Sequence, residues 1–168
     1  MEKRLAAEYS NPDLAGVAIS YDFSLKTLSD SLPIDQFFSA ADEVLARYGA
    51  RPDGKSHRYV ASLPDGNKVG LYSISLFEYS LPFHASLEPI GGMGASFCDF
   101  VYEFACATES VLYNEGNPQL VVVVHTPMID QVREVFPPET RIVRVSSANA
   151  LLKALESNGR PGRVRPIL

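Results

Sequence analysis

The feature that most constrains the fold is the run Leu120–Val124 (LVVVV), which is apolar on both faces of any strand that it forms. Such a strand belongs in the interior of a sheet that is covered on both sides. A second β-forming run, Arg141–Val145 (RIVRV), follows after a segment that is long enough for a helical crossover. Strands joined in this way lie parallel with a right-handed connection, so the C-terminal third predicts a parallel β-α-β unit.

The helices of this unit have recognisable starts. Thr126 and Pro127 suit the N-cap and the first helical position of the crossover helix. After the second strand, Ser146 or Ser147 can cap a last helix, which carries leucines at helical spacing and stops at Gly159.

The first two thirds of the chain predict a strand, a helix, a β-hairpin, an irregular loop and a second helix. The strands follow from alternating apolar residues, the helices from single apolar faces, and the hairpin turn from Asp65-Gly66. The loop is inferred from two prolines and three glycines. The predicted ranges are, in the same order, Ala15–Phe23, Ile34–Tyr48, Tyr59–Leu63 with Val69–Tyr79, Leu81–Gly94 and Ser96–Tyr113.

The predicted order is β-α-β-β-α-β-α-β-α, which places the chain in the α/β (α+β) class. Its first six elements match the split β-α-β pattern of ferredoxin-like folds, and a parallel β-α unit extends this start at the C-terminus. The length of 168 residues suits one domain. We therefore predict a single domain with a mixed β-sheet over residues 1–159, followed by a basic, proline-containing tail over residues 160–168.

The charge balance excludes some classes of partner. The net charge is −5, and three arginines in the tail offset a more acidic body. An acidic body repels phosphate backbones, so nucleic-acid binding is disfavoured. No apolar run approaches the roughly 20 residues of a membrane span, and the first residues lack the apolar stretch of a signal peptide. We expect a soluble, cytoplasmic protein that does not associate with membranes.

Three polar residues that follow predicted strands are candidates for catalysis: Asp22, His125 and Ser146. Ligands of parallel sheets bind beyond the carboxyl ends of the strands, and these residue types perform nucleophilic and acid–base chemistry. However, the serine does not lie in a nucleophile elbow, and capping a helix is a simpler role for it. A structural role is therefore favoured for these residues.

The glycine-rich segment Gly91–Ser96 (GGMGAS) precedes a predicted helix, whose N-terminus could hold an anion. A phosphate loop needs a strand that leads directly into it, and His84–Ile90 is a poor strand because it contains Pro89. No lysine follows the glycines. A tight loop with Ser96 as a helix cap is the interpretation that we favour.

The helix predicted after this loop has a polar face of acidic and tyrosine side chains. Tyrosine beside acidic residues is typical of protein interfaces. The candidate partner-binding residues are Asp99, Tyr102, Glu103 and Glu109.

The cysteines and histidines form no recognisable site. On a helix, Cys98 and Cys106 would lie about 12 Å apart, which is too far for a disulfide. Their spacing is not that of a metal or redox pair, and His57 and His84 stand alone in a turn and a loop. We therefore expect neither a metal nor a cofactor.

Three classes of function remain. The first is a small acidic, non-enzymatic protein that covers a basic partner, as toxin-neutralising immunity proteins or inhibitors do. The second is a small hydrolase or transferase that uses Asp22, His125 and Ser146. The third is a structural or assembly subunit, whose tail reaches another copy in a homo-oligomer. The acidic body and the absence of a catalytic motif favour the first.

Overall fold

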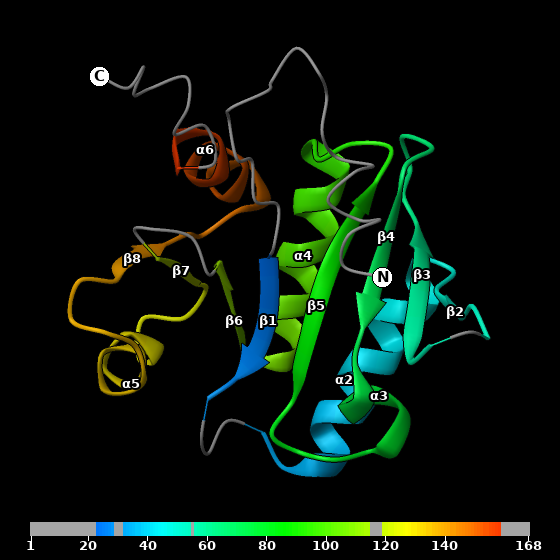
Figure 1. The fold of residues 1–168 in the computed structure, drawn as a ribbon, viewed down its shortest axis with the longest axis horizontal. Coiled ribbons are helices and arrows are strands. Elements are labelled where there is room, and N and C mark those ends of the chain that lie inside the picture. Colours follow the sequence, from blue (N-terminus) through cyan, green and yellow to red (C-terminus); the bar gives the residue numbers. More distant parts are fainter. Residues whose placement is uncertain (1–22, 29–31, 55, 115–118, 159–168) are drawn as a thin grey trace.

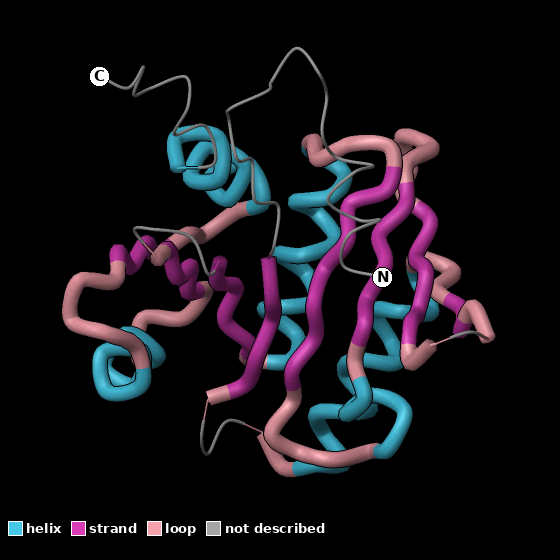
Figure 2. The backbone as a smooth tube through the Cα atoms, viewed as in Figure 1, coloured by secondary structure: helices cyan, strands magenta, loops and turns pink. Residues whose placement is uncertain are grey.

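The structure is a computed structural model that describes residues 23–28, 32–54, 56–114 and 119–158. Figure 1 shows the arrangement of its elements, and Figure 2 distinguishes the helices, strands and loops in the same view. The strands are β1 (Phe23–Thr27), β2 (Arg51–Pro52), β3 (Arg58–Ser62), β4 (Lys68–Tyr72), β5 (His84–Ile90), β6 (Ser110–Asn114), β7 (Leu120–Val123) and β8 (Arg141–Arg144). The helices are α2 (Ile34–Arg47), α3 (Ile74–Glu78), α4 (Ala95–Thr108), α5 (Met128–Val135) and α6 (Ala148–Asn158).

The eight strands form one mixed sheet in the order β2-β3-β4-β5-β1-β6-β7-β8. Neighbouring strands are antiparallel except for β7 and β8, which are parallel. β1 therefore lies between β5 and β6, two strands that come much later in the chain. The described part of the chain is a mixed α/β domain of the α+β class.

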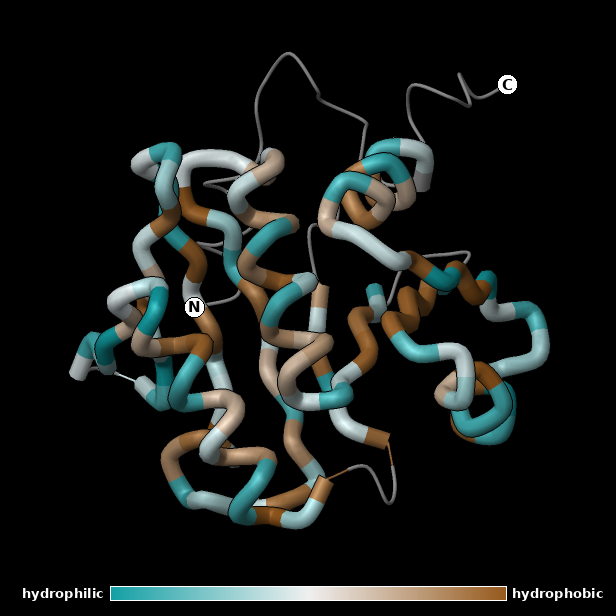
Figure 3. The backbone as a smooth tube through the Cα atoms, turned by 180° about the vertical axis from the view of Figure 1, so that it is seen from behind, coloured by the Kyte–Doolittle hydropathy of each residue, from teal (hydrophilic) through white to brown (hydrophobic). Residues whose placement is uncertain are grey.

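Helices α2, α4 and α6 cover one face of the sheet, as the views from the front and from behind show (Figures 1 and 3). α4 is central in this layer because it packs against both α2 and α6. Its Phe97, Phe100 and Phe104 are completely buried, and Phe37 of α2 joins them in the core. Burial of such a side chain is worth about 1.5–3 kcal/mol, so these rings anchor the layer to the sheet.

The opposite face of the sheet is polar over β3, β4, β5 and β1. In β1, Phe23 and Leu25 are buried, whereas Ser24 and Lys26 alternate to the other side. α5 lies on this second side, where Phe136 at its C-terminal end packs against Tyr113 of β6. We call the second side the polar face. By strand register it carries Arg58, Gly70, Tyr72, His84, Ser86, Glu88, Ser24 and Lys26.

The C-terminal unit is confirmed. β7 and β8 are parallel and are joined through α5, as the fully apolar run at 120–124 predicted. Ser147 caps α6, because its Oγ accepts a hydrogen bond from the backbone N–H of Ala150 at 3.0 Å. α5 begins at Met128, so Pro127 rather than Thr126 occupies the N-cap position. The helix at 34–47 and the hairpin around Asp65-Gly66 are also confirmed.

Two predictions between residues 69 and 94 were wrong. The second hairpin strand ends at Tyr72, because Ser73 caps the short helix α3 with its side chain. The segment predicted as an irregular loop contains β5, a strand between β4 and β1. Pro89 lies near the end of β5, opposite Val69 of β4.

The predicted helix at 96–113 is two elements. α4 begins at Ala95 with Gly94 in the N-cap position, so Ser96 lies inside the helix and does not cap it. The helix ends at Glu109, which adopts the left-handed conformation with φ 51°, and β6 follows directly. The predicted ferredoxin-like order of the first six elements is therefore interrupted by β5 and β6, which flank β1.

Some predictions fall outside the described residues. The strand predicted at 15–23 overlaps the described part only at Phe23, where β1 begins, and the tail at 160–168 lies beyond it. Among the described residues, no helix is both long and apolar enough to cross a membrane.

Candidate functional site

The structure brings two of the three catalytic candidates to the same edge of the sheet. β7 and β8 pair in parallel with Val123 opposite Arg144, so His125 and Ser146 lie at matching positions two residues further on. His125 is half-buried and Ser146 is exposed. Within the described part of the chain, no hydrogen bond joins their side chains. Asp22 lies outside the described residues, so its relation to the other two is not defined.

The candidate partner-binding residues on α4 differ in their exposure and in their contacts. Only Asp99 is exposed. Glu103 faces α2, where its Oε2 lies 3.2 Å from the Arg47 guanidinium nitrogen Nη1. Burial and the neighbouring Glu103 carboxylate raise the pKa of Tyr48 to about 12. Glu103 is therefore engaged within the molecule.

The other two residues of this face are also partly covered. Tyr102 is half-buried, and burial, together with the neighbouring Cys106 thiol, raises the pKa of its phenol. Glu109 is the C-cap residue that follows α4. Cys98 and Cys106 are both free thiols, as their spacing predicted. The α4 face offers a partner less acidic surface than its sequence suggests.

The glycine-rich loop does follow a strand, contrary to our expectation, since β5 runs directly into it. Gly91 has φ 95°, and a Cβ there would lie 2.5 Å from Oδ1 of Asn67. Glycine is thus required because the β3–β4 turn packs against the loop. This packing contact is a structural explanation for the glycine at position 91.

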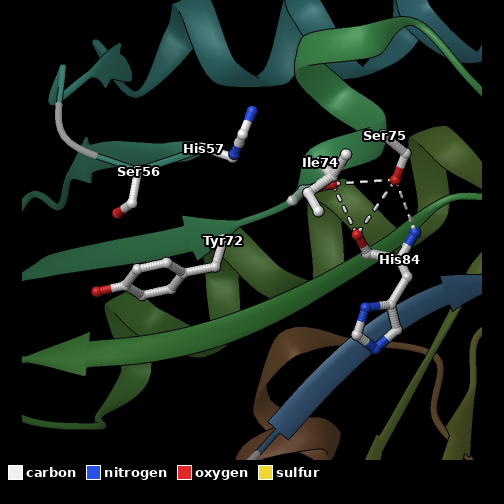
Figure 4. A pocket seen from close by; sticks show the side chains of 7 residues that line it. Ser56, His57, Tyr72, Ile74, Ser75 and His84 are labelled. Atoms are coloured by element: carbon white, nitrogen blue, oxygen red, sulfur yellow. Dashed lines mark hydrogen bonds between the residues drawn. The ribbon is translucent and has the colours of Figure 1, made fainter. Parts of the chain in front are cut away.

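A shallow cavity of about 370 Å³ lies between the ends of β3 and β4, the start of α3 and His84 of β5. Figure 4 shows the seven residues that line it: Ser56, His57, Tyr72, Ser73, Ile74, Ser75 and His84. Ser73 Oγ donates to the carbonyl of His84 at 2.6 Å and accepts from the N–H of Leu76. Ser75 Oγ accepts from the His84 N–H at 3.1 Å. Because both hydroxyls hold the backbone together, neither is placed as a nucleophile.

An ionic cluster crosses three strands of the polar face. Arg58 of β3 binds the Asp53 carboxylate through Nε, and its Nη1 lies 3.0 Å from Oε2 of Glu88 and 2.8 Å from the Tyr72 hydroxyl. Tyr72 donates to the same carboxylate oxygen at 2.8 Å. Gly70 leaves the space for this cluster, since a Cβ there would lie 3.2 Å from Glu88 Oε2. The cluster is internally paired, which is typical of a structural network.

A group of exposed apolar and acidic side chains lies along α2 and at the C-terminal end of α3. We call it the α2–α3 surface and define it as Ile34, Asp35, Asp42, Glu78, Tyr79 and Leu81. The ring centre of Tyr79 lies 4.9 Å from that of Phe38 of α2. Phe38 lies between Ile34 and Asp42 on one face of this helix. Asp42 and Tyr79 both act on the phenol of Tyr59, whose pKa is raised first by burial and then by these two groups. The contact between Tyr79 and Phe38 joins the two elements at this surface.

The α2–α3 surface is apolar and acidic at once. Tyr79 is 60% exposed, Ile34 45% and Leu81 37%, although large apolar side chains are usually buried. Residues 32–46 and 73–83 contain four acidic residues and neither lysine nor arginine. Sequence reasoning missed this surface because it assigned Tyr79 to a strand. The available signal was Ser73, whose N-cap role places the following residues on a helix.

Comparisons with protein-family models, curated proteins and solved structures find no match for this chain. Within the described residues, no three histidine, cysteine or acidic side chains gather as a metal centre requires.

Proposed function

We propose that this chain is a non-enzymatic protein-binding domain and that its α2–α3 surface is the docking site. The observation that carries the proposal is the cluster of exposed Tyr79, Ile34 and Leu81 among carboxylates. The chemistry of this surface fits a partner segment that carries basic side chains and at least one apolar side chain. A domain of this kind acts by covering its partner, as inhibitors and toxin-neutralising proteins do.

The two kinds of side chain have different roles in such a complex. Exposed aromatic residues are frequent centres of binding energy, because they bury a large area with few rotatable bonds. Carboxylates around them attract a basic partner and orient it during encounter. Tyr79 would be the anchor, and Asp35, Asp42 and Glu78 would form the charged rim.

The test is affinity capture with three matched variants, followed by measurement of the dissociation constant for the captured protein. Tyr79→Ala removes the anchor and Asp42→Lys reverses one rim charge. Asp99→Lys makes the same charge reversal at the exposed end of the α4 face. We expect Tyr79→Ala and Asp42→Lys to weaken binding tenfold or more, and Asp99→Lys to change it little.

Each result separates the alternatives once urea unfolding has shown that the variants remain folded. Loss of binding in Asp99→Lys alone would transfer the docking site to the α4 face with Tyr102, Glu103 and Glu109. A captured second copy of this chain would indicate a homo-oligomeric subunit. Failure to capture any partner would overturn the proposal and favour the hydrolase or transferase hypothesis, which the matching positions of His125 and Ser146 support.

A further inference from the structure

A second cavity lies between α5 and β8, at the edge of the sheet (Figure 1). Its volume is about 480 Å³, which suits a small organic molecule. It is lined by residues of α5, of the turn that follows and of β8: Val132, Arg133, Pro137, Pro138, Thr140 and Ile142. The cavity shares no residue with the α2–α3 surface.

The turn beside this cavity contains a polar group without a partner. Pro137 and Pro138 follow α5, and the Thr140 N–H donates to the Pro137 carbonyl at 3.0 Å, which returns the chain to β8. The Oγ1 atom of Thr140 is buried, and no hydrogen-bond partner for it lies within the described part of the chain. A buried hydroxyl without a partner costs free energy, and rotation about the Cα–Cβ bond can turn it towards a ligand. The cavity therefore has a hydrogen-bonding group that the fold does not use.

The positive charge at the cavity comes from Arg133. Its Nη1 lies 3.9 Å from Oδ1 of Asp130, and the two side chains are 70% and 88% exposed. Solvent screens such an exposed pair, so the attraction between the two groups is weak. A guanidinium has five N–H donors, and one distant carboxylate oxygen leaves most of them available to a ligand.

The rest of the cavity wall is apolar. Val132 is completely buried and Ile142 is half-buried. The two prolines add rigid rings that lose little conformational freedom when a ligand packs against them. This wall suits the apolar body of a ligand, whereas Arg133 and Thr140 suit an anionic acceptor group.

We propose that this cavity binds a small carboxylic acid in its ionised form. Arg133 holds the carboxylate, because a planar guanidinium can donate two parallel hydrogen bonds to its two oxygens. The Thr140 hydroxyl donates a further hydrogen bond to the carboxylate, and the apolar body of the acid packs against Val132 and Ile142. This inference is independent of the proposed docking function.

The test is a titration of the isotope-labelled full chain with benzoate, followed by NMR at constant pH and ionic strength. We expect saturable shifts of the Val132, Thr140 and Ile142 signals. Benzyl alcohol has the ring without the charge, and acetate has the charge without the ring, so each should bind at least tenfold more weakly. Shifts that never saturate with benzoate, or equal affinity for either of the other two compounds, would overturn the proposal.

Variants decide whether the two polar groups hold the carboxylate. Arg133→Gln removes the charge, so we expect the affinity for benzoate to fall tenfold or more. Thr140→Val keeps the shape of the side chain but removes the hydroxyl, so affinity should fall about threefold. Without benzoate, the urea midpoint of Thr140→Val should stay the same or rise, because the hydroxyl has no partner in the fold.

The matched control is Arg51→Gln, at an exposed arginine of the opposite edge strand β2, which should bind benzoate as the wild-type chain does. Unchanged binding by Arg133→Gln would overturn the proposal. A lowered urea midpoint in Thr140→Val would show that the fold itself uses the hydroxyl and would overturn the role given to Thr140.

Discussion

At the scale of single residues, Tyr48 shows how burial beside a carboxylate connects protonation to stability. The neutral phenol is favoured in the folded state, where its pKa is about 12 instead of 10. Its contribution to the free energy of unfolding is therefore complete below pH 10 and is lost as the pH rises towards 12. Tyr48 is only half-buried, so solvent screening limits this contribution to about 1 kcal/mol.

We predict that Tyr48→Phe reduces the loss of stability between about pH 10 and 12. Urea unfolding at several pH values across this interval measures the effect. The phenols of Tyr59, Tyr72 and Tyr102 also have raised pKa values, so a smaller loss should persist in the variant. Tyr79→Phe, at an exposed ring, serves as the control. An identical pH dependence in wild type and Tyr48→Phe would contradict the assignment.

At the scale of elements, the junction of α4 and β6 depends on an unfavourable backbone conformation. Glu109 has φ 51°, which costs a residue with a Cβ about 1–2 kcal/mol, and its N–H bonds to the carbonyl of Ala105. We predict that Glu109→Gly raises the free energy of unfolding by about 0.5–1 kcal/mol, after the greater chain entropy of glycine is counted. Denaturant unfolding at neutral pH measures this change. Destabilisation would mean that the Glu109 side chain makes a stabilising contact that outweighs its backbone strain.

The same junction shows why the sequence predicted some elements and not others. Val111 and Leu112 continue the helical spacing of α4, and the break between them and the helix is a glutamate with no sequence signal for a left-handed conformation. β5 was missed because Pro89 within it, together with Pro82 and the glycines that flank it, outweighs a short alternating pattern. By contrast, the C-terminal unit has a fully apolar strand and a serine cap, so local pattern and final structure agree there.

The candidate sites were harder to predict than the elements, because they combine residues that are distant in sequence. The α2–α3 surface exists only because the Tyr79 ring packs against Phe38 of α2. His125 and Ser146 could be placed together from the sequence, since a parallel β-α-β unit fixes which strand ends are neighbours. The acidic face of α4 followed from helical spacing, but its covering by α2 and α6 depends on tertiary packing.

At the scale of the whole molecule, the net charge of −5 should affect how fast a partner associates. Attraction between an acidic surface and a basic partner acts over a Debye length, which falls from about 10 Å at 0.1 M salt to about 3 Å at 1 M. We predict that the association rate constant falls as salt is raised, while the dissociation rate constant changes less. Stopped-flow or surface-based kinetics at several salt concentrations would measure both. A salt-independent association rate would exclude electrostatic steering.

The two strands at the edges of the sheet affect how this molecule can associate with other molecules. β2 consists only of Arg51 and Pro52, and the four-residue β8 has Arg141 and Arg144 at its ends. Short edges with proline and repelling guanidinium groups are poor templates for an incoming strand, so the sheet resists growth into fibrils or swapped dimers. At high concentration, neighbouring molecules should therefore contact one another through side chains and not through backbone pairing. We expect the protein to resist aggregation under these conditions.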